Sequence, residues 1–271
     1  MGRVASRSDC RNAGQFDSLA ISMRPLRLDQ GVSLVRTVRG VVAPLTGFIQ
    51  PEMLDLFRTE GACMIDIAQA VREANTVRKA TSDEADKLAA ILARAFFDDP
   101  AMRWVIVDDQ RRGELLERSF GLYLRKLWFK QDECYTTGSS AGAIVWERPG
   151  EWKVGIIDQL RLLPSMARIN GRLLPRILRG LAALEANHPV EPHYYLPFVG
   201  VEPEWQGRGL GTALMRPVLD RCDGEKVPAY LEASSPRNRA LYERHGFRVT
   251  EEFSLGPGSP PLWRMWRAPN D

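Results

Sequence analysis

Three glycines at alternate positions are the clearest chemical feature of the 271-residue sequence: Gly207, Gly209 and Gly211. A run of aromatic and β-branched residues, 193–201, precedes them, and residues 210–222 carry apolar side chains at helical spacing. Glycine lets the backbone approach a ligand closely, and unpaired amides at a helix N-terminus carry a partial positive charge. The segment is therefore predicted to be a strand, a loop and a helix that hold a phosphate or pyrophosphate.

The spacing of these glycines does not fit the two common nucleotide-binding loops. A P-loop requires a lysine after its last glycine, and no lysine follows here. In the dinucleotide pattern GxGxxG, the last glycine position falls on Thr212 when counted from Gly207 and on Leu214 when counted from Gly209. A Rossmann-type nucleotide-binding module is therefore disfavoured.

Two longer stretches carry a family resemblance. Residues 199–211, VGVEPEWQGRGLG, resemble the acetyl-CoA-binding motif of the GNAT superfamily of N-acetyltransferases. Residues 228–238, PAYLEASSPRN, together with 241–247, LYERHGF, resemble the later motif of that family. The pattern is most similar to puromycin N-acetyltransferase-like members, which show a proline like Pro217 in the pyrophosphate helix. The resemblance covers about 76–267 and is concentrated in the last third.

The resemblance implies an acetyl-CoA site. Amides of the loop would hold the pyrophosphate, while the strand at 199–201 would separate from its neighbour and pair its backbone with the pantetheine arm. Asn238 either hydrogen-bonds that arm or caps the following helix. The cofactor-binding residues are predicted to be Val199, Gly200, Val201, Gln206, Gly207, Arg208, Gly209, Leu210, Gly211, Thr212 and Asn238.

Two residues are predicted to be catalytic. Tyr242 would protonate the departing CoA thiolate, since a phenol with a pKa of about 10 stays protonated at neutral pH; the alternative is a half-buried packing residue. Glu232, at a strand end, would accept the proton of the attacking amine, directly or through water; the alternative is a structural carboxylate. Cys222 falls at the far end of the helix, so direct attack is favoured over a covalent intermediate.

The predicted reaction moves an acetyl group from acetyl-CoA to a primary amine of a small molecule. Two alternatives remain open: a protein acetyltransferase acting on a lysine or an N-terminus, and a non-catalytic acyl-CoA-binding sensor. The first half of the chain, which resembles the family least, is expected to build the acceptor pocket. Candidate lining residues are Phe96, Phe97, Trp104, Tyr123 and Trp146.

The order of the predicted elements is mixed, with strands and helices interleaved and hairpins at both ends, which fits an α+β (mixed α/β) fold. The GNAT resemblance implies a central, mostly antiparallel twisted sheet flanked by helices. Residues 152–184 are predicted to be helical with interruptions at Pro164, Gly171 and Pro175, and Pro217 is expected to bend its helix or end it early.

The sequence divides into two parts. Residues 1–75 are predicted to be an extension, poorly ordered or with short helices at 52–60 and 64–74, and 76–268 the acetyltransferase domain. The first 50 residues hold seven arginines and three aspartates. An upstream extension ahead of an alternative start at Met64 is also compatible with this pattern.

Composition narrows the partners. The formal charge of +3 is too small to indicate a nucleic-acid partner. The sequence contains no run of about 18 apolar residues, so no membrane span is predicted. Four scattered cysteines predict reduced thiols in a cytoplasmic protein, and the three histidines form no metal pattern, so no metal is expected. A monomer and a homodimer are both compatible with the sequence. Five arginines in 152–184 either meet an anionic partner or membrane surface, or lie on a solvated helix face: Arg161, Arg168, Arg172, Arg176 and Arg179.

Overall fold

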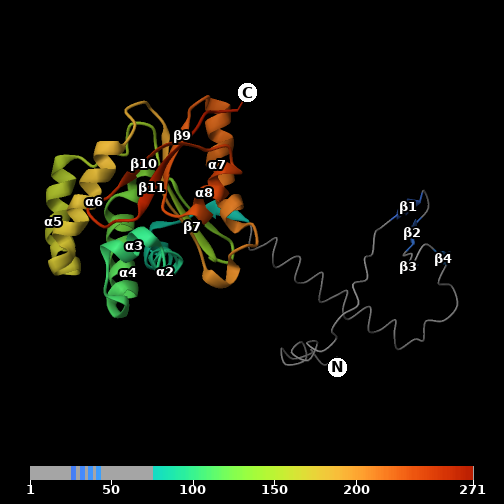
Figure 1. The fold of residues 1–271 in the computed structure, drawn as a ribbon, viewed down its shortest axis with the longest axis horizontal. Coiled ribbons are helices and arrows are strands. Elements are labelled where there is room, and N and C mark those ends of the chain that lie inside the picture. The colour runs from blue at the N-terminus through green and yellow to red at the C-terminus, as the bar shows by residue number, and fades with distance from the viewer. Residues whose placement is uncertain (1–25, 29–30, 34–35, 39–40, 44–75, 271) are drawn as a thin grey trace. The chain divides into compact units, whose positions relative to one another are not determined.

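The computed structural model describes residues 76–270 and four short strands nearer the N-terminus (Figure 1). These strands form two antiparallel pairs, β1 (Leu26–Leu28) with β2 (Gly31–Ser33) and β3 (Arg36–Val38) with β4 (Val41–Ala43). None of these four strands is among the elements predicted from the sequence. The helices predicted at 52–60 and 64–74 lie outside the described residues, and the domain boundary at residue 76 stays a prediction.

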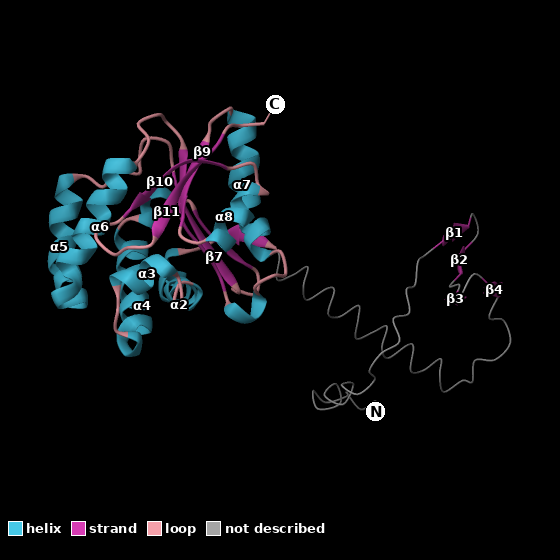
Figure 2. Cartoon of the chain, viewed as in Figure 1, coloured by secondary structure: helices cyan, strands magenta, loops and turns pink. Residues whose placement is uncertain are grey.

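A seven-stranded sheet forms the centre of residues 76–270, in the order β10-β11-β9-β8-β7-β6-β5 (Figure 2). Only β8 and β9 are parallel; every other neighbouring pair in this sheet is antiparallel. The predicted fold class, a mostly antiparallel mixed sheet flanked by helices, is confirmed. The strands are β5 (Val77–Lys79), β6 (Cys134–Thr137), β7 (Gly142–Glu147), β8 (Tyr194–Val201), β9 (Ala229–Ala233), β10 (Arg248–Ser254) and β11 (Pro261–Arg267).

Helices cover both faces of this sheet. Along β7 the side chains alternate, so that Ala143 and Val145 pack into the core formed with α2 (Ala85–Ala95) and α4 (Asp109–Lys126). Ile144 and Trp146 point to the opposite face and pack with α7 (Leu210–Glu225). This two-sided burial explains why all six residues of β7 are buried.

A second helical layer lies beside α4. It consists of α5 (Ile156–Asn170) and α6 (Leu174–Asn187), which Figure 1 shows at the left of the sheet. The prediction of a break at Pro164 is wrong, because α5 continues through it. The interruption predicted at Gly171 is present, since its positive φ of 51° turns the chain before α6. Pro175 interrupts no helix, because it lies in the first turn of α6.

Two further features differ from the sequence expectations. A short helix, α3 (Pro100–Val105), was not predicted; Asp99 caps it by accepting hydrogen bonds from the amides of Ala101 and Met102, with Pro100 at its first position. The early helix end expected at Pro217 is wrong, because α7 runs on to Glu225. The remaining helix, α8 (Pro236–Glu243), follows β9.

Two observations bear on the other predicted properties. Cys134 and Cys222 are buried free thiols, and burial raises the pKa of each to about 12. Among the described residues, no helix combines the length and the apolarity that a membrane span requires.

Candidate active site

A notch opens in the sheet where β8 and β9 part. The two strands pair only from Tyr194 to Leu196, which lies opposite Leu231. Beyond that point β8 pairs only with β7, out to Val201, and β9 only with β11. Pro197, which has no amide hydrogen to donate, follows the last paired residue. The predicted separation of the 199–201 segment from its neighbour is therefore present, and one edge of that segment is left without a strand partner.

The glycine loop lies at the end of β8, directly before α7. Gly207 and Gly209 have φ values of +78° and +86°, which side-chain-bearing residues rarely adopt. The first helical bond of α7 runs from the amide of Ala213 to the carbonyl of Gly209. The amides of Leu210, Gly211 and Thr212 precede it and have no hydrogen-bond acceptor among the described residues.

Side-chain contacts fix this loop against the sheet and α2. The amide nitrogen of Gln206 donates to the carbonyl of Val201 at 3.1 Å. Arg94 on α2 forms a bidentate ion pair with the buried Glu202: its Nε and Nη2 donate to the two carboxylate oxygens at 2.8 and 2.5 Å. At Gly200 a Cβ atom would lie 2.8 Å from the Cβ of Ala95, so glycine is needed there for the close approach of α2.

A chain of hydrogen bonds joins α8 to the start of α3. The amide group of Asn238 donates to the hydroxyl of Ser234 at 3.4 Å, and that hydroxyl donates to the carboxylate of Asp99. The alternative reading of Asn238 as a helix cap is wrong, because α8 begins at Pro236 and its cap is Ser235. The side chain of Asn238 is thus free of that task.

Tyr242 lies one turn after Asn238 on the same side of α8. Its residue is 8% exposed, and its hydroxyl has no hydrogen-bond partner among the described residues. Burial and the nearby charge of Asp99 raise the pKa of the phenol well above its usual value. The group therefore keeps its proton at neutral pH.

Glu232 lies in a buried polar cluster on the sheet face opposite α7. The hydroxyl of Tyr195 on β8 donates to one carboxylate oxygen at 2.8 Å, while the other oxygen has no hydrogen-bond partner among the described residues. Burial raises the pKa of Glu232 to about 7, against the opposing effects of the Tyr195 hydrogen bond and the charge of Arg264. A buried carboxyl with this pKa can take up and release a proton near neutral pH.

Two histidines adjoin the carboxyl of Glu232: His188 lies next to it, and His193 lies next to His188. His193 Nδ1 lies 2.5 Å from the carbonyl of Glu191, which can only accept, so Nδ1 carries the proton and Nε2 is the acceptor in the neutral ring. His188 Nε2, at 2.9 Å, must then donate to it. His188 Nδ1 is left bare and faces the unpartnered oxygen of Glu232 at 4.0 Å. Burial lowers the pKa of His188 to about 3, so the ring is neutral.

A second carboxyl, Glu147 on β7, belongs to the same cluster. Burial and the charge of Glu232 raise its pKa to about 8, and the indole of Trp128 donates to it at 3.0 Å. Glu147, Tyr195 and His188 are not predictable as site residues from the sequence, because nothing in their local sequence marks them. They come together only through the strand order β7-β8-β9.

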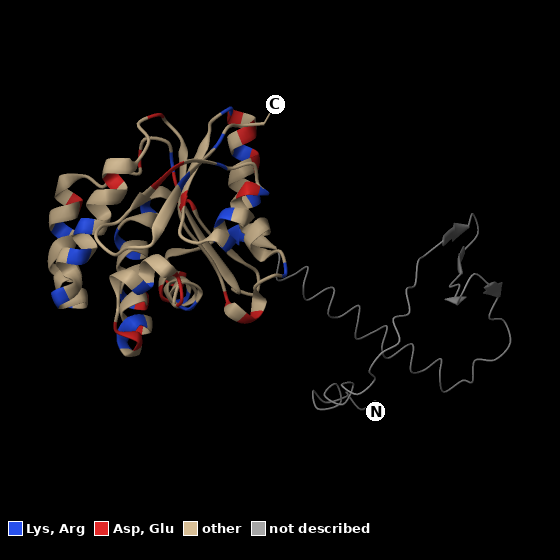
Figure 3. Cartoon of the chain, in the orientation of Figure 1, with Lys and Arg blue, Asp and Glu red and all other residues tan. Residues whose placement is uncertain are grey.

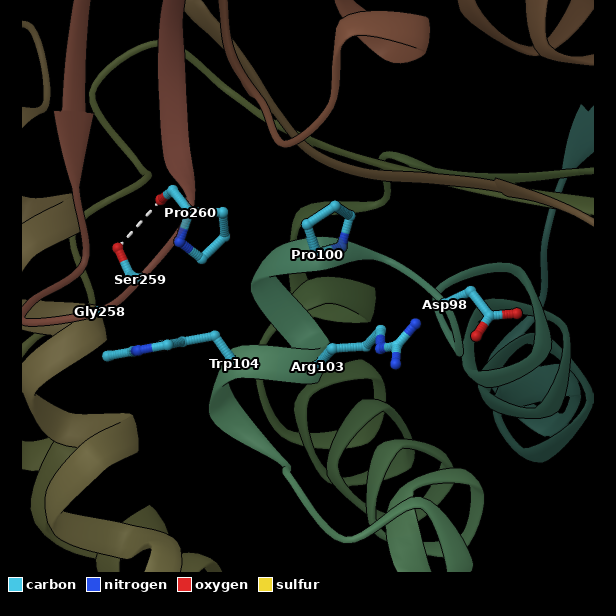
Figure 4. Close-up of a pocket in the computed structure, with 7 residues that line it drawn as sticks. All are labelled: Asp98, Pro100, Arg103, Trp104, Gly258, Ser259 and Pro260. Carbon is cyan, nitrogen blue, oxygen red and sulfur yellow. Dashed lines mark hydrogen bonds between the residues drawn. The ribbon is translucent and has the colours of Figure 1, made fainter.

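A pocket of about 540 Å³ opens beside the start of α3 (Figure 4). We call it the Trp104 pocket; it is lined by Asp98, Pro100, Arg103, Trp104, Gly258, Ser259 and Pro260. Of the five predicted lining residues, only Trp104 lines it. Phe96 and Tyr123 pack against the α2–α4 core, Trp146 is fully buried in the α7 core, and Phe97 lies against Arg112.

The Trp104 pocket adjoins the notch. Asp98 and Pro100 flank Asp99, whose carboxylate accepts from Ser234. Trp263, three residues after Pro260, pairs with Ala233 at the end of β9. The pocket therefore adjoins the C-terminal end of β9. Ser234 directly follows this end, and Asn238 and Tyr242 lie on α8, the next element. No cluster of three or more metal-ligating side chains occurs among the described residues.

Comparisons with known proteins agree on one family. The profile of the acetyltransferase (GNAT) family matches residues 116–247. An uncharacterized N-acetyltransferase of Schizosaccharomyces pombe is 30% identical over 197 residues, which cover 68% of this chain and 79% of that protein.

Solved structures share the fold. A Corynebacterium glutamicum structure described as histone acetyltransferase HPA2 and related acetyltransferase aligns with a TM-score of 0.57 and 27% identity, over 72% of this chain and 97% of that chain. Arylalkylamine N-acetyltransferase 2 of Aedes aegypti aligns with a TM-score of 0.51 over 72% of this chain and 98% of its own. At 15% identity the second comparison shows a common fold alone.

Proposed function

Since the chain belongs to the GNAT family of acetyltransferases, we propose that it transfers an acetyl group from acetyl-CoA to the primary amine of a small molecule. Acetyl-CoA is the general co-substrate of this family. The observation that carries the proposal is the meeting of three features at one end of the sheet: the notch, the glycine loop and the buried phenol of Tyr242.

The glycine loop would bind the pyrophosphate of acetyl-CoA. The free amides of Leu210, Gly211 and Thr212 and the positive end of α7 suit an anion. The exposed Arg208, whose guanidinium lies 5.1 Å from the ring of Trp205, adds a positive charge beside the loop. The edge of Val199–Val201 that has no strand partner would hydrogen-bond the pantetheine arm, except for the Val201 carbonyl, which accepts from Gln206. The side chain of Asn238 would hydrogen-bond the same arm.

Glu232 would act as the general base. The attacking amine must lose a proton, and the buried carboxyl, with a pKa of about 7, can receive it. Protonated Glu232 could then donate toward the bare Nδ1 of His188, which stabilises the neutral carboxyl. The carbon–nitrogen bond forms as the amine attacks the thioester carbonyl.

Tyr242 would act as the general acid. When the carbon–sulfur bond breaks, the CoA thiolate needs a proton, and the phenol supplies it. The raised pKa keeps that proton in place until the thiolate develops. Both groups recover their starting protonation by exchange with solvent, so protons balance over one turnover.

The Trp104 pocket would receive the acceptor amine. It adjoins the notch through the Asp99–Ser234 hydrogen bond and lies outside the glycine loop, so the two substrates approach the reaction centre from different elements. Direct transfer fits this arrangement, since both described cysteines are buried with raised pKa values and neither lies at the notch.

Thiol release from acetyl-CoA, measured against a panel of amines and peptides, tests the proposal. Tyr242→Phe should lower kcat by about 10²-fold or more and change the KM for acetyl-CoA little, because the hydroxyl acts only in the transition state. Tyr123→Phe is the matched control: its phenol is buried in the core against Met166 and should leave kcat unchanged. A chain that binds acetyl-CoA but turns over no amine would instead be a sensor.

One observation favours a second candidate. The Corynebacterium glutamicum structure, at 27% identity, is described as a histone acetyltransferase and related acetyltransferase, which supports a protein lysine acceptor. The peptide arm of the same assay decides: faster thiol release with lysine-containing peptides than with small amines would replace the first candidate with this one.

A further inference from the structure

Three arginines surround the Trp104 pocket. Arg103 lines it and is exposed, extending from α3 on the side opposite Trp104 (Figure 4). Arg176 on α6 places its guanidinium 4.4 Å from the centre of the Trp104 ring. The side chain of Arg179, one turn further along α6, packs against Gly256 in the turn that leads to the pocket residues 258–260.

None of the three forms an ion pair or a hydrogen bond with a described residue. Asp98 is the single acid among the lining residues and offsets one of the three charges. The acid of α6, Glu185, is already paired with Lys153 at 2.9 Å. Figure 3, which colours Lys and Arg positions blue and Asp and Glu positions red, shows more blue than red along α5 and α6. The pocket and its surroundings therefore carry an excess of positive charge.

The other walls of the pocket are apolar and flat. Pro100, Trp104 and Pro260 present ring surfaces, and the hydroxyl of Ser259 donates to the carbonyl of Pro260. A guanidinium next to such walls presents a rigid fork of donors that matches the two oxygens of a carboxylate. A ring with a carboxylate at one end suits these surfaces better than a second ammonium does.

We propose that the acceptor is an amine that also carries a carboxylate, and that the Trp104 pocket binds this carboxylate through Arg103. The proposal rests on the function proposed above, with the amine directed to Glu232 and Tyr242 and the anion held at the far end. Arg176, next to the Trp104 ring, and Arg179, next to Gly256, add positive charges of the same sign around the pocket. Polyamines would be poor acceptors, because their second ammonium would face these guanidinium groups.

Three probes with the same reacting amine and the same ring test this charge preference. They are 4-(aminomethyl)benzoate, benzylamine and 4-(aminomethyl)benzylamine, whose far ends are negative, neutral and positive. Their dissociation constants are measured by NMR titration of the full chain in the presence of CoA, and their kcat/KM values by thiol release from acetyl-CoA. Both series should favour the carboxylate over benzylamine by about fivefold to tenfold, with the diamine weakest.

Variants assign the preference to the pocket. Arg103→Ala should bring the ratio of carboxylate to neutral probe close to one, and Arg103→Glu should invert it. Asp98→Asn should increase the ratio, because it removes the one acidic side chain that lines the pocket. Arg168→Ala is the matched control: Arg168 is exposed on α5 without an ion pair and lines a different pocket, so the ratio should stay as in the wild type.

The outcomes separate this inference from the proposed function. Equal or reversed affinities of the three probes in the wild type would overturn the inference, even if amines are acetylated. So would an Arg103→Glu variant that keeps the wild-type order. If the three probes bind in the expected order but no thiol is released, the anion-binding role of the Trp104 pocket would stand and the proposed acetyl transfer would be overturned.

Discussion

Burial decides the chemistry available to Glu232. A carboxyl with a pKa of about 7 is half ionised at neutral pH, whereas an exposed glutamate would be fully ionised and a weaker base. The same burial keeps the phenol of Tyr242 protonated. Two groups with opposite tasks thus lie near one notch, each with the protonation state that its proposed task requires.

The pH dependence of the rate should report Glu232. Below pH 7 its carboxyl is protonated and cannot accept a proton, so kcat/KM should rise with pH with a midpoint near 7. Glu232→Gln should lower kcat by about 10²-fold or more and remove this limb from the residual activity. An unchanged pH profile in the variant would assign the base to another group. Steady-state thiol release from pH 5 to 9 provides the measurement.

The same residue should make stability depend on pH. Its pKa is higher in the folded chain than the unfolded value of 4.5, so the stabilisation is fully present below about pH 4.5 and is lost as pH rises through about 7. Glu232→Gln, neutral at every pH, should therefore be more stable than the wild type at pH 8, by a free energy of unfolding on the order of 3 kcal/mol. The difference should shrink toward pH 5.

Urea unfolding at pH 5 and pH 8 measures this difference. The matched control is Glu117→Gln, at an exposed glutamate on α4, where wild type and variant should differ by the same small amount at both pH values. A Glu232→Gln variant less stable than the wild type at pH 8 would show that the carboxyl is bound to partners as an anion.

At the scale of elements, two glycines at the two ends of α7 should respond oppositely to alanine. Gly209 has φ +86°, so Gly209→Ala forces strain of about 1 kcal/mol or more into the loop and should also raise the KM for acetyl-CoA. Gly224 is helical, and an added Cβ there would meet no atom within 4 Å, so Gly224→Ala should stabilise the protein by about 0.5–1 kcal/mol. Thermal unfolding and acetyl-CoA titration check both variants, and equal signs would contradict the assigned role of the loop.

Elements whose conformation is set by residues close together in the sequence could be predicted. The glycine loop and the strand before it are predicted from residues 193–213, because the conformations they require are set by glycine itself and by alternation along one strand. The family is predicted from the motifs at 199–211, 228–238 and 241–247. The short α3 was missed because its cap and first residue, Asp99 and Pro100, also read as a helix end. A break is expected at Pro164 and a bend or an early helix end at Pro217, but α5 and α7 both continue past these prolines.

The cluster around Glu232 could not be predicted in the same way. Its members come from β7, β8, β9 and the segment after α6, and their meeting depends on strand order and register. The same holds for the Trp104 pocket, which joins α3 to the turn between β10 and β11. Sequence alone supplied Trp104 as one of five aromatic candidates, with no local signal to separate it from core residues.

At the scale of the whole molecule, the chain divides into two compact units, Met1–Met64 and Ile65–Asp271. Every residue of the proposed site belongs to the second. A chain that starts at Met64 should therefore fold and keep the kcat and both KM values of the full chain. Activity assays and circular dichroism of the truncated and full chains provide the test, and a truncated chain that folds but has lost turnover would assign residues before Met64 a part in the site.

The short pairing of β8 with β9 has a mechanical consequence. Three residue pairs form the only backbone ladder between the strands β5–β8 and the strands β9–β11 of the described sheet. Under a pulling force β8 and β9 should separate readily, because this strand pair has few hydrogen bonds to resist the force. Acetyl-CoA bound in the notch as proposed would form hydrogen bonds on both the β8 side and the β9 side of this line, and would therefore strengthen the connection between the two parts of the sheet. The ligand would then set the mechanical strength of the fold as well as its chemistry.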